Sequence, residues 1–274
     1  MQTLLAYINW NASPDIISIG FLTLKWYGLF FASGFLLGLF MVKRMFAVEN
    51  APEEWLDKAF IYIVLGAVLG ARFGHVFFYD WDYYSQHLSE IPMIWRGGLA
   101  SHGGAIGVLI ALWLFSRNVS RQSMLWILDK VVVPTALAAA FIRMGNMMNS
   151  EILGKPADVA WAFVFLKVDD VPRHPVQLYE SITYLISFAV LYQVYWKTDF
   201  RFYPGKIFGL FLIFIFGSRI LWEQFKDSLG GFEESLGLLS TGQWLSIPFV
   251  LTGLYFVFRN TEKVGYKFKK TNKS

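Results

Sequence analysis

The residues best suited to chemistry lie at the end of an apolar stretch, between Phe141 and Glu151. Arg143, Asn146 and Asn149 recur every three residues, a spacing that places them on one face of a helix. An arginine within a membrane span usually faces a protein-lined cavity and binds something there. One guanidinium and two amides suit a phosphate or a carboxylate. The alternative is an arginine that extends from the helix end to lipid headgroups.

Other polar side chains near the ends of apolar stretches are candidates for the same site. Arg219 and Arg143 together can hold an anionic ester, because a planar guanidinium matches phosphate oxygens. Glu223 follows Arg219 by four residues, so it either offsets the buried charge or takes part in chemistry. His102 is either a general base or a structural histidine. Tyr27 suits a substrate contact and an interfacial aromatic belt equally.

Glycine spacing indicates both an anion site and close helix packing. Gly103 and Gly104 follow Ser101 at the start of an apolar stretch, where uncovered backbone N–H groups and the helix dipole favour an anion. Small residues four apart let helices approach closely in lipid. Such series occur at Gly34 and Gly38, at Gly66, Gly70 and Gly74, and at Gly103 and Gly107. We therefore expect a tight helix bundle.

The composition places these residues in an all-α polytopic membrane protein. The chain has 274 residues, of which 55% are hydrophobic and 19% aromatic. Seven stretches approach the roughly 20 residues that span a bilayer. They are 22–42, 58–79, 98–116, 128–148, 177–196, 206–225 and 239–258. We expect one integral membrane domain over residues 1–274, with an outer-face loop at about 149–176 and a basic cytoplasmic tail at about 259–274.

The distribution of basic residues predicts the orientation of the chain. Of the 24 Lys and Arg residues, fifteen lie on the side of the C-terminal tail and six on the opposite side. The positive-inside rule then places the N-terminus outside and the C-terminus in the cytoplasm. The remaining three, Arg72, Arg143 and Arg219, are intramembrane. With this orientation, polar groups from six spans gather in the outer half of the bilayer, which predicts a site open to the outer leaflet. The loop at 149–176 is either a lid or substrate platform, or a simple packed loop.

Some chemistries are excluded by residue counts. The chain has no cysteine, which removes disulfides, thiolate metal sites and a thiol nucleophile of its own. Its four histidines are too scattered for a metal cage. We expect no metal, no cofactor and no nucleic-acid partner.

The motifs resemble those of bacterial prolipoprotein diacylglyceryl transferases. The resemblance rests on Arg143-Met144-Gly145-Asn146-Met147-Met148-Asn149-Ser150-Glu151 with Gly154, Trp26-Tyr27-Gly28, Ser101-His102-Gly103-Gly104, His174-Pro175-Val176-Gln177-Leu178-Tyr179-Glu180, and Arg219 with Glu223. These motifs cover nearly the whole chain. Ile142 stands where the family often has glycine, and Met147 stands where it often has phenylalanine. We interpret both differences as changes in packing. Lys226 stands where the family pattern predicts arginine, a departure that puts only a peripheral anion contact in doubt.

The resemblance implies an activity, its partners and its location. The family transfers the diacylglyceryl group of phosphatidylglycerol to the lipobox cysteine of a preprolipoprotein, forming a thioether and releasing glycerol phosphate. It implies a multi-pass protein of the bacterial cytoplasmic (inner) membrane, in contact with membrane lipids. The partners would be phosphatidylglycerol and preprolipoprotein signal peptides that carry a lipobox cysteine.

The resemblance also implies roles for single residues. Arg143 and Arg219 would stabilise charge on the departing phosphate, His102 would deprotonate the thiol, and Tyr27 would contact the lipid. The phosphatidylglycerol site would comprise Arg143, Asn146, Glu151, Gly154, Ser101, Gly103, Gly104 and Glu223.

The competing function is a transporter or flippase that binds an anionic lipid without chemistry. That class predicts a midplane site and an internal repeat, and the two halves of the sequence show no repeat. A purely structural scaffold would leave three intramembrane arginines unexplained.

Overall fold

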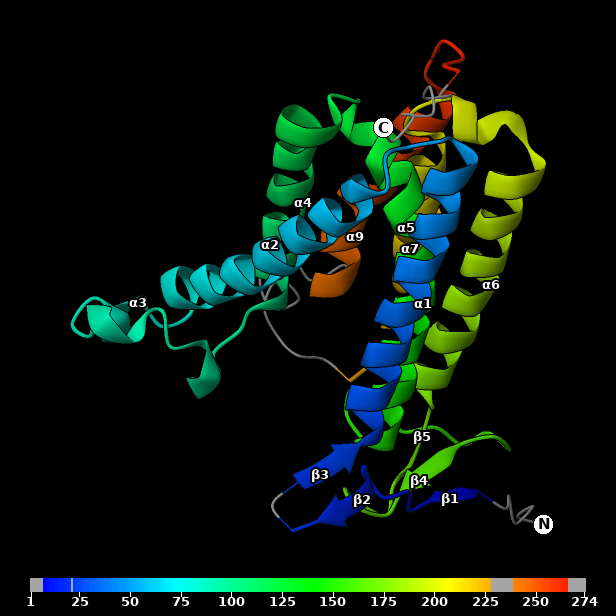
Figure 1. The fold of residues 1–274 in the computed structure, drawn as a ribbon. Helices are drawn as coiled ribbons and strands as arrows, with labels where there is room; N and C mark the ends of the chain where they lie inside the picture. Colours follow the sequence, from blue (N-terminus) through cyan, green and yellow to red (C-terminus); the bar gives the residue numbers. More distant parts are fainter. Residues whose placement is uncertain (1–6, 21, 228–238, 266–274) are drawn as a thin grey trace. The chain divides into compact units, whose positions relative to one another are not determined.

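The computed structural model describes residues 7–20, 22–227 and 239–265, and most of them are helical. Each of the seven predicted stretches overlaps a long helix (Figure 1). These helices are α1 (Trp26–Val48), α2 (Glu54–Phe78), α4 (Ser101–Phe115), α5 (Met124–Met148), α6 (Val176–Lys197), α7 (Lys206–Glu223) and α9 (Thr241–Phe258). The predicted basic tail at 259–274 lies partly outside the described residues.

Five of these helices are long and apolar enough to cross a membrane: α1, α2, α4 with the turn that follows it, α5 and α9. The chain is therefore a helical membrane protein. The other two, α6 and α7, carry the ionised residues Glu180, Arg219 and Glu223. Charged residues lower the apparent hydrophobicity of a segment, so a count of seven spans stays a prediction.

The chain forms two compact units. Among the described residues, the first comprises residues 7–41 and 129–264 and the second comprises residues 42–128 with Gly265, without the positions that the structure does not describe. A division into compact units does not test whether the whole chain is one integral membrane domain, so that expectation stays a prediction.

In the second unit, α2 and α4 pack through their glycines. A Cβ atom at Gly74 would lie 2.7 Å from the Gly103 Cα, and one at Gly107 would lie 2.8 Å from the Gly70 Cα. Real Cβ atoms do not approach that closely, so these positions require glycine. The predicted close packing is confirmed for this helix pair.

Arg72 fixes the loop that joins α2 to α4. Its guanidinium is almost fully buried and donates hydrogen bonds to the backbone oxygens of Glu90 (2.8 Å), Ile91 (2.7 Å), Gly97 (2.8 Å) and Gly98 (3.3 Å). The loop contains α3 (Trp81–Tyr84) and two 3₁₀ turns, η1 (Leu88–Glu90) and η2 (Ile94–Arg96). Arg72 thus satisfies four backbone carbonyl groups of the loop, which gives this arginine of α2 a structural role.

In the first unit, glycines again set the helix contacts. A Cβ at Gly34 of α1 would lie 3.0 Å from the Ala138 Cα of α5, and Gly209 of α7 faces Gly253 of α9. Asp129 of α5 caps α7 by accepting hydrogen bonds from the backbone N–H groups of Gly205 (2.7 Å) and Phe208 (2.8 Å). A carboxylate at a helix N-terminus satisfies free donors and complements the dipole.

Besides its helices, the first unit contains two small β-sheets made of short strands. β1 (Ile8–Trp10) pairs in parallel with β4 (Phe163–Phe165), which pairs antiparallel with β5 (Pro172–Arg173). β2 (Asp15–Ile19) and β3 (Leu22–Lys25) form an antiparallel hairpin. Figure 1 shows β4 and β5 beside the N-terminal end of α6. Phe163 and Phe165 are buried with Met147, so the loop at 149–176 is anchored to the end of α5.

Candidate functional site

Five ionised side chains form a continuous cluster in the first unit. The Arg143 Nε lies 2.7 Å from one Glu180 carboxylate oxygen, and the Lys226 Nζ lies 2.9 Å from the other. Lys226 also lies 3.0 Å from the Glu223 carboxylate. Arg219 completes the cluster more loosely, with its Nε 3.7 Å from Glu223. The order of charges is therefore Arg143, Glu180, Lys226, Glu223, Arg219.

The cluster carries an excess of positive charge, and its arginines are its accessible members. Three cations face two carboxylates. The Glu180 side chain is fully buried, whereas the side chains of Arg143 and Arg219 are 18% and 34% exposed. Tyr184 interacts electrostatically with Glu180 and with both arginines, which places them in one neighbourhood. An anion that approaches this cluster meets guanidinium groups, while the buried carboxylates hold those groups in place.

The amides of the signature motif extend the cluster. Arg143 donates to the Asn146 side-chain oxygen (3.3 Å), which confirms that these two residues share a helix face. Asn146 donates in turn to Glu151 (3.2 Å). Asn149 lies beyond the end of α5 and donates to the other Glu151 oxygen (3.0 Å) instead of facing Arg143. The fully buried Gln177 holds the Glu151 backbone oxygen (2.7 Å), so this segment is ordered from two sides.

Glycines give the site residues room. A Cβ at Gly145 would lie 2.7 Å from the Tyr27 ring, so Tyr27 packs directly on the signature helix. A Cβ at Gly242 would lie 2.8 Å from a Glu223 carboxylate oxygen. Gly154 approaches His174 and Val176 as closely. Close packing therefore explains glycine at all three positions, and a role for Gly154 in lipid binding stays a prediction.

The predicted residues at the start of α4 belong to the second unit. Ser101 and His102 are exposed in the first turn of the helix, while Gly103 packs on α2. Gly104 makes ordinary contacts with α2. Packing alone accounts for glycine at 103, and the assignment of all four residues to the site stays a prediction.

Lys226 and Glu180 contribute more to the cluster than their sequence context indicates. Lys226 is not peripheral to the cluster, because its Nζ lies between two carboxylates and the residue is almost fully buried. Its spacing of three residues from Glu223 was the one feature of the sequence that could have predicted an ion pair between the two side chains. Glu180 appeared only as part of a motif, since its partner Arg143 lies 37 residues away. Sequence spacing on one helix does not reveal such pairs.

The loop at 149–176 is packed onto the end of α7. Arg173 pairs with Asp227 (2.6 Å) and Asp169 (2.6 Å), and the backbone N–H of Lys155 donates to Phe225 (2.8 Å). Arg173 holds the pKa of Asp169 below its usual value, and burial lowers the pKa of His174. These contacts favour the packed loop over a free lid.

The fold and the cluster define a helical membrane protein with a buried, net positive group of ionised side chains suited to an anionic ligand. Residues 14–259 match the family model described as prolipoprotein diacylglyceryl transferase. The chain belongs to that family.

Proteins from several bacteria share close to half of their residues with this chain. A phosphatidylglycerol–prolipoprotein diacylglyceryl transferase of Chloroherpeton thalassium is 47% identical over 94% of this chain and 96% of its own length. A transferase of the same description from Tolumonas auensis is 45% identical over 93% of this chain and 98% of its own length. One from Porphyromonas gingivalis is 44% identical over 94% of this chain and 96% of its own length.

Proposed function

We propose that this chain transfers the diacylglyceryl group of phosphatidylglycerol to the thiol of a lipobox cysteine in a preprolipoprotein. The substrate thiol loses its proton, and the thiolate forms a C–S bond with the glyceryl carbon next to the phosphate ester. The C–O bond to that phosphate breaks, so glycerol phosphate leaves with the bonding electrons. Family membership over residues 14–259 is the observation that carries this proposal.

The charged cluster supports roles for the two arginines in this reaction. Negative charge grows on the departing phosphate as the C–O bond breaks. Arg143, fixed by Glu180 at 2.7 Å, and Arg219, loosely paired at 3.7 Å, would stabilise that charge. His102 would take the thiol proton, and Tyr27 would contact the lipid.

The remaining contacts are assigned to phosphatidylglycerol binding. Asn146, Glu151 and Gly154 would shape the site with Glu223. The first turn of α4 would present the backbone N–H groups of Ser101, His102 and Gly103 to the phosphate, with Gly104 next to them.

We propose that the site faces the outer leaflet of the bacterial inner membrane. This placement rests on seven spans with the N-terminus outside, and on the asymmetry of basic residues. The signal peptide of an exported preprolipoprotein would reach the site from that side.

A transfer assay tests the proposal directly. Purified full-length protein is incubated with phosphatidylglycerol and a peptide that carries a lipobox cysteine. We expect the peptide to gain the mass of one diacylglyceryl group and an equal amount of glycerol phosphate to appear. A peptide with serine in place of the cysteine is the matched control and should remain unmodified. Lipid movement between leaflets without peptide modification would instead support a flippase.

A further inference from the structure

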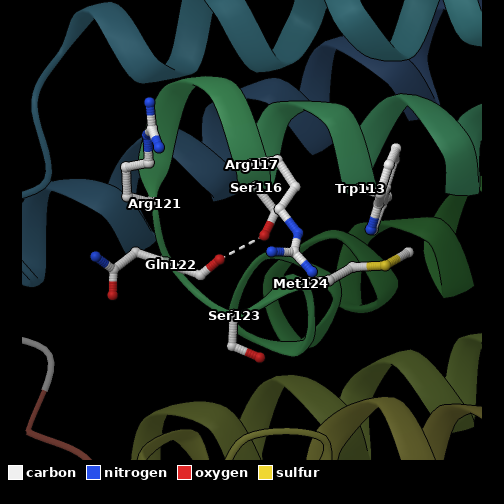
Figure 2. A pocket seen from close by; sticks show the side chains of 7 residues that line it. All are labelled: Trp113, Ser116, Arg117, Arg121, Gln122, Ser123 and Met124. Carbon is white, nitrogen blue, oxygen red and sulfur yellow. Dashed lines mark hydrogen bonds between the residues drawn. The ribbon is translucent and has the colours of Figure 1, made fainter.

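An open pocket lies at the end of α4, within the second unit. Its volume is about 420 Å³, within the range of about 300 to 1,000 Å³ typical of small-molecule sites. The turn between α4 and α5 forms it (Figure 2). The pocket is lined by Trp113, Ser116, Arg117, Arg121, Gln122, Ser123 and Met124.

Hydrogen bonds make the turn that carries the pocket rigid. A π-helical turn, Ser116–Ser120, follows α4. The Ser116 hydroxyl donates to the Gln122 backbone oxygen across the turn. The Gln122 side chain donates to the Ser120 backbone oxygen (3.3 Å), and its backbone N–H donates to the Ser120 hydroxyl (3.3 Å). The pocket is therefore preorganised, which reduces the entropy lost when a ligand binds.

Within the described part of the chain, the two arginines that line the pocket form no ion pair with a carboxylate. Arg117 and Arg121 are four residues apart and both exposed. None of the ion pairs among the described residues involves either of them. The Arg117 guanidinium lies 6.0 Å from the centre of the Trp113 ring, which orients it without neutralising it. In Figure 2 the Arg117 side chain extends over the turn towards Met124, whereas the Arg121 side chain points away from Met124.

Arg121 ends the π-helical turn in a left-handed conformation, with a φ of +55°. A left-handed residue is a common way for a helix to end, so this conformation is part of the turn that forms the pocket. Two arginines that form no ion pair among the described residues thus lie on a turn that is held by its own hydrogen bonds.

We propose that this pocket binds a phosphate group, with Arg117 as the direct contact and Arg121 as a supporting positive charge. A guanidinium presents two N–H groups that match two phosphate oxygens. The phosphate could come from the headgroup of an anionic lipid or from free phosphate. The pocket lies at the end of a candidate membrane span, which favours the lipid headgroup. The proposal does not depend on the transfer reaction.

Oxidative footprinting of Met124 tests the proposal, because this side chain lines the pocket. Full-length protein is placed in nanodiscs of phosphatidylcholine, of phosphatidylcholine with phosphatidic acid, or of phosphatidylcholine with inorganic phosphate in the buffer. The rate of Met124 sulfoxide formation is measured by peptide mass spectrometry relative to Met93, a partly buried methionine of the same unit. We expect phosphatidic acid to slow Met124 oxidation by about threefold or more. Slowing by inorganic phosphate as well would identify free phosphate as a sufficient ligand.

Charge variants distinguish the pocket from general attraction to the membrane. Arg117→Gln should abolish the protection, Arg117→Lys should keep a small part of it, and Arg121→Gln should weaken it. Lys43→Gln removes one exposed positive charge elsewhere in the same unit and should leave protection unchanged. If Arg117→Gln fails to fold, the reduced protection expected in Arg117→Lys and Arg121→Gln is the result that tests the proposal. Equal Met124 oxidation of the wild type in all three preparations would overturn the proposal, and so would protection of wild-type size in Arg117→Gln or in both Arg117→Lys and Arg121→Gln.

Discussion

At the scale of single residues, the two arginines of the cluster are held differently. Arg143 makes a close ion pair with a fully buried carboxylate at 2.7 Å and a hydrogen bond to Asn146. Arg219 lies 3.7 Å from Glu223 and its Nε makes no hydrogen bond among the described residues. Arg143 is thus preorganised, whereas Arg219 retains more capacity for new hydrogen bonds. Both properties suit the stabilisation of a phosphate that gains charge.

Lysine should not replace either arginine. Arg143→Lys and Arg219→Lys keep the charge but lose the planar fork that holds two oxygens. We expect each to lower the single-turnover transfer rate on the order of a hundredfold, with a much smaller effect on phosphatidylglycerol affinity, because interactions formed only in the transition state affect the rate.

The matched control for these variants is Arg96→Lys, at an exposed ion pair with Glu90 in the other unit. It should retain normal transfer. Near-normal transfer by both Arg143→Lys and Arg219→Lys would remove the arginines from the mechanism.

His102 gives a prediction that depends on pH. If this exposed histidine generates the substrate thiolate, His102→Gln should lose most of the rate at neutral pH. Part of the rate should return as the pH approaches the thiol's own pKa of about 8.5, where the thiolate forms without a base. The measurement is a pH–rate profile of transfer. His87→Gln, at an exposed loop histidine, is the control; a His102→Gln protein that is folded but equally slow at every pH would indicate a structural role.

At the scale of elements, the sequence predicted the long helices and missed the short strands. Continuous apolar runs revealed all seven helices, and glycine spacing revealed the contact between α2 and α4. The three-residue strands β1 and β4 are too short for a periodic signal, and their pairing joins residues 8–10 to 163–165. For the site, Arg143 with Asn146 followed from local spacing, whereas Glu180 and Lys226 required tertiary contacts.

The loop at 149–176 should lose part of its stability in acid. Arg173 favours the ionised form of Asp169 and lowers its pKa in the folded state. The stabilisation is therefore present above the unfolded pKa of about 3.9, and is lost as the pH falls through the lower folded pKa. Asp169→Asn should reduce thermal stability at pH 7 by at most about 1 kcal/mol, since the pair is partly exposed.

The comparison of pH 7 with strong acid identifies the origin of that effect. Below pH 3 the difference between Asp169→Asn and the wild type should shrink towards zero in thermal unfolding. Asp170→Asn, at an exposed neighbour, should match the wild type at both pH values. An Asp169→Asn difference that is constant with pH would show that the ion pair with Arg173 does not stabilise the loop.

At the scale of the whole molecule, the charges that build the site also obscure the membrane topology. Five of the described helices meet the length and hydropathy of a span, while α6 and α7 contribute Glu180, Arg219 and Glu223 to the cluster. Burying those residues against one another lowers the cost of placing them in a bilayer. Seven spans would put the two chain ends on opposite sides of the membrane, so the position of the ends tests the number of spans.

The absence of cysteine from the sequence makes topology measurable by labelling single introduced cysteines. Gln86 and Asn118 are both exposed and lie at opposite ends of α2 and α4. With the N-terminus outside, an impermeant thiol reagent should label Gln86→Cys in sealed cells and leave Asn118→Cys near background, because the basic loop around Arg117 and Arg121 stays in the cytoplasm. Both variants should label after permeabilisation, which controls for accessibility, and a reporter active only in the cytoplasm should work when fused after Ser274. Labelling of Asn118→Cys in sealed cells would reverse the orientation and move the charged cluster to the inner leaflet, away from exported preprolipoproteins.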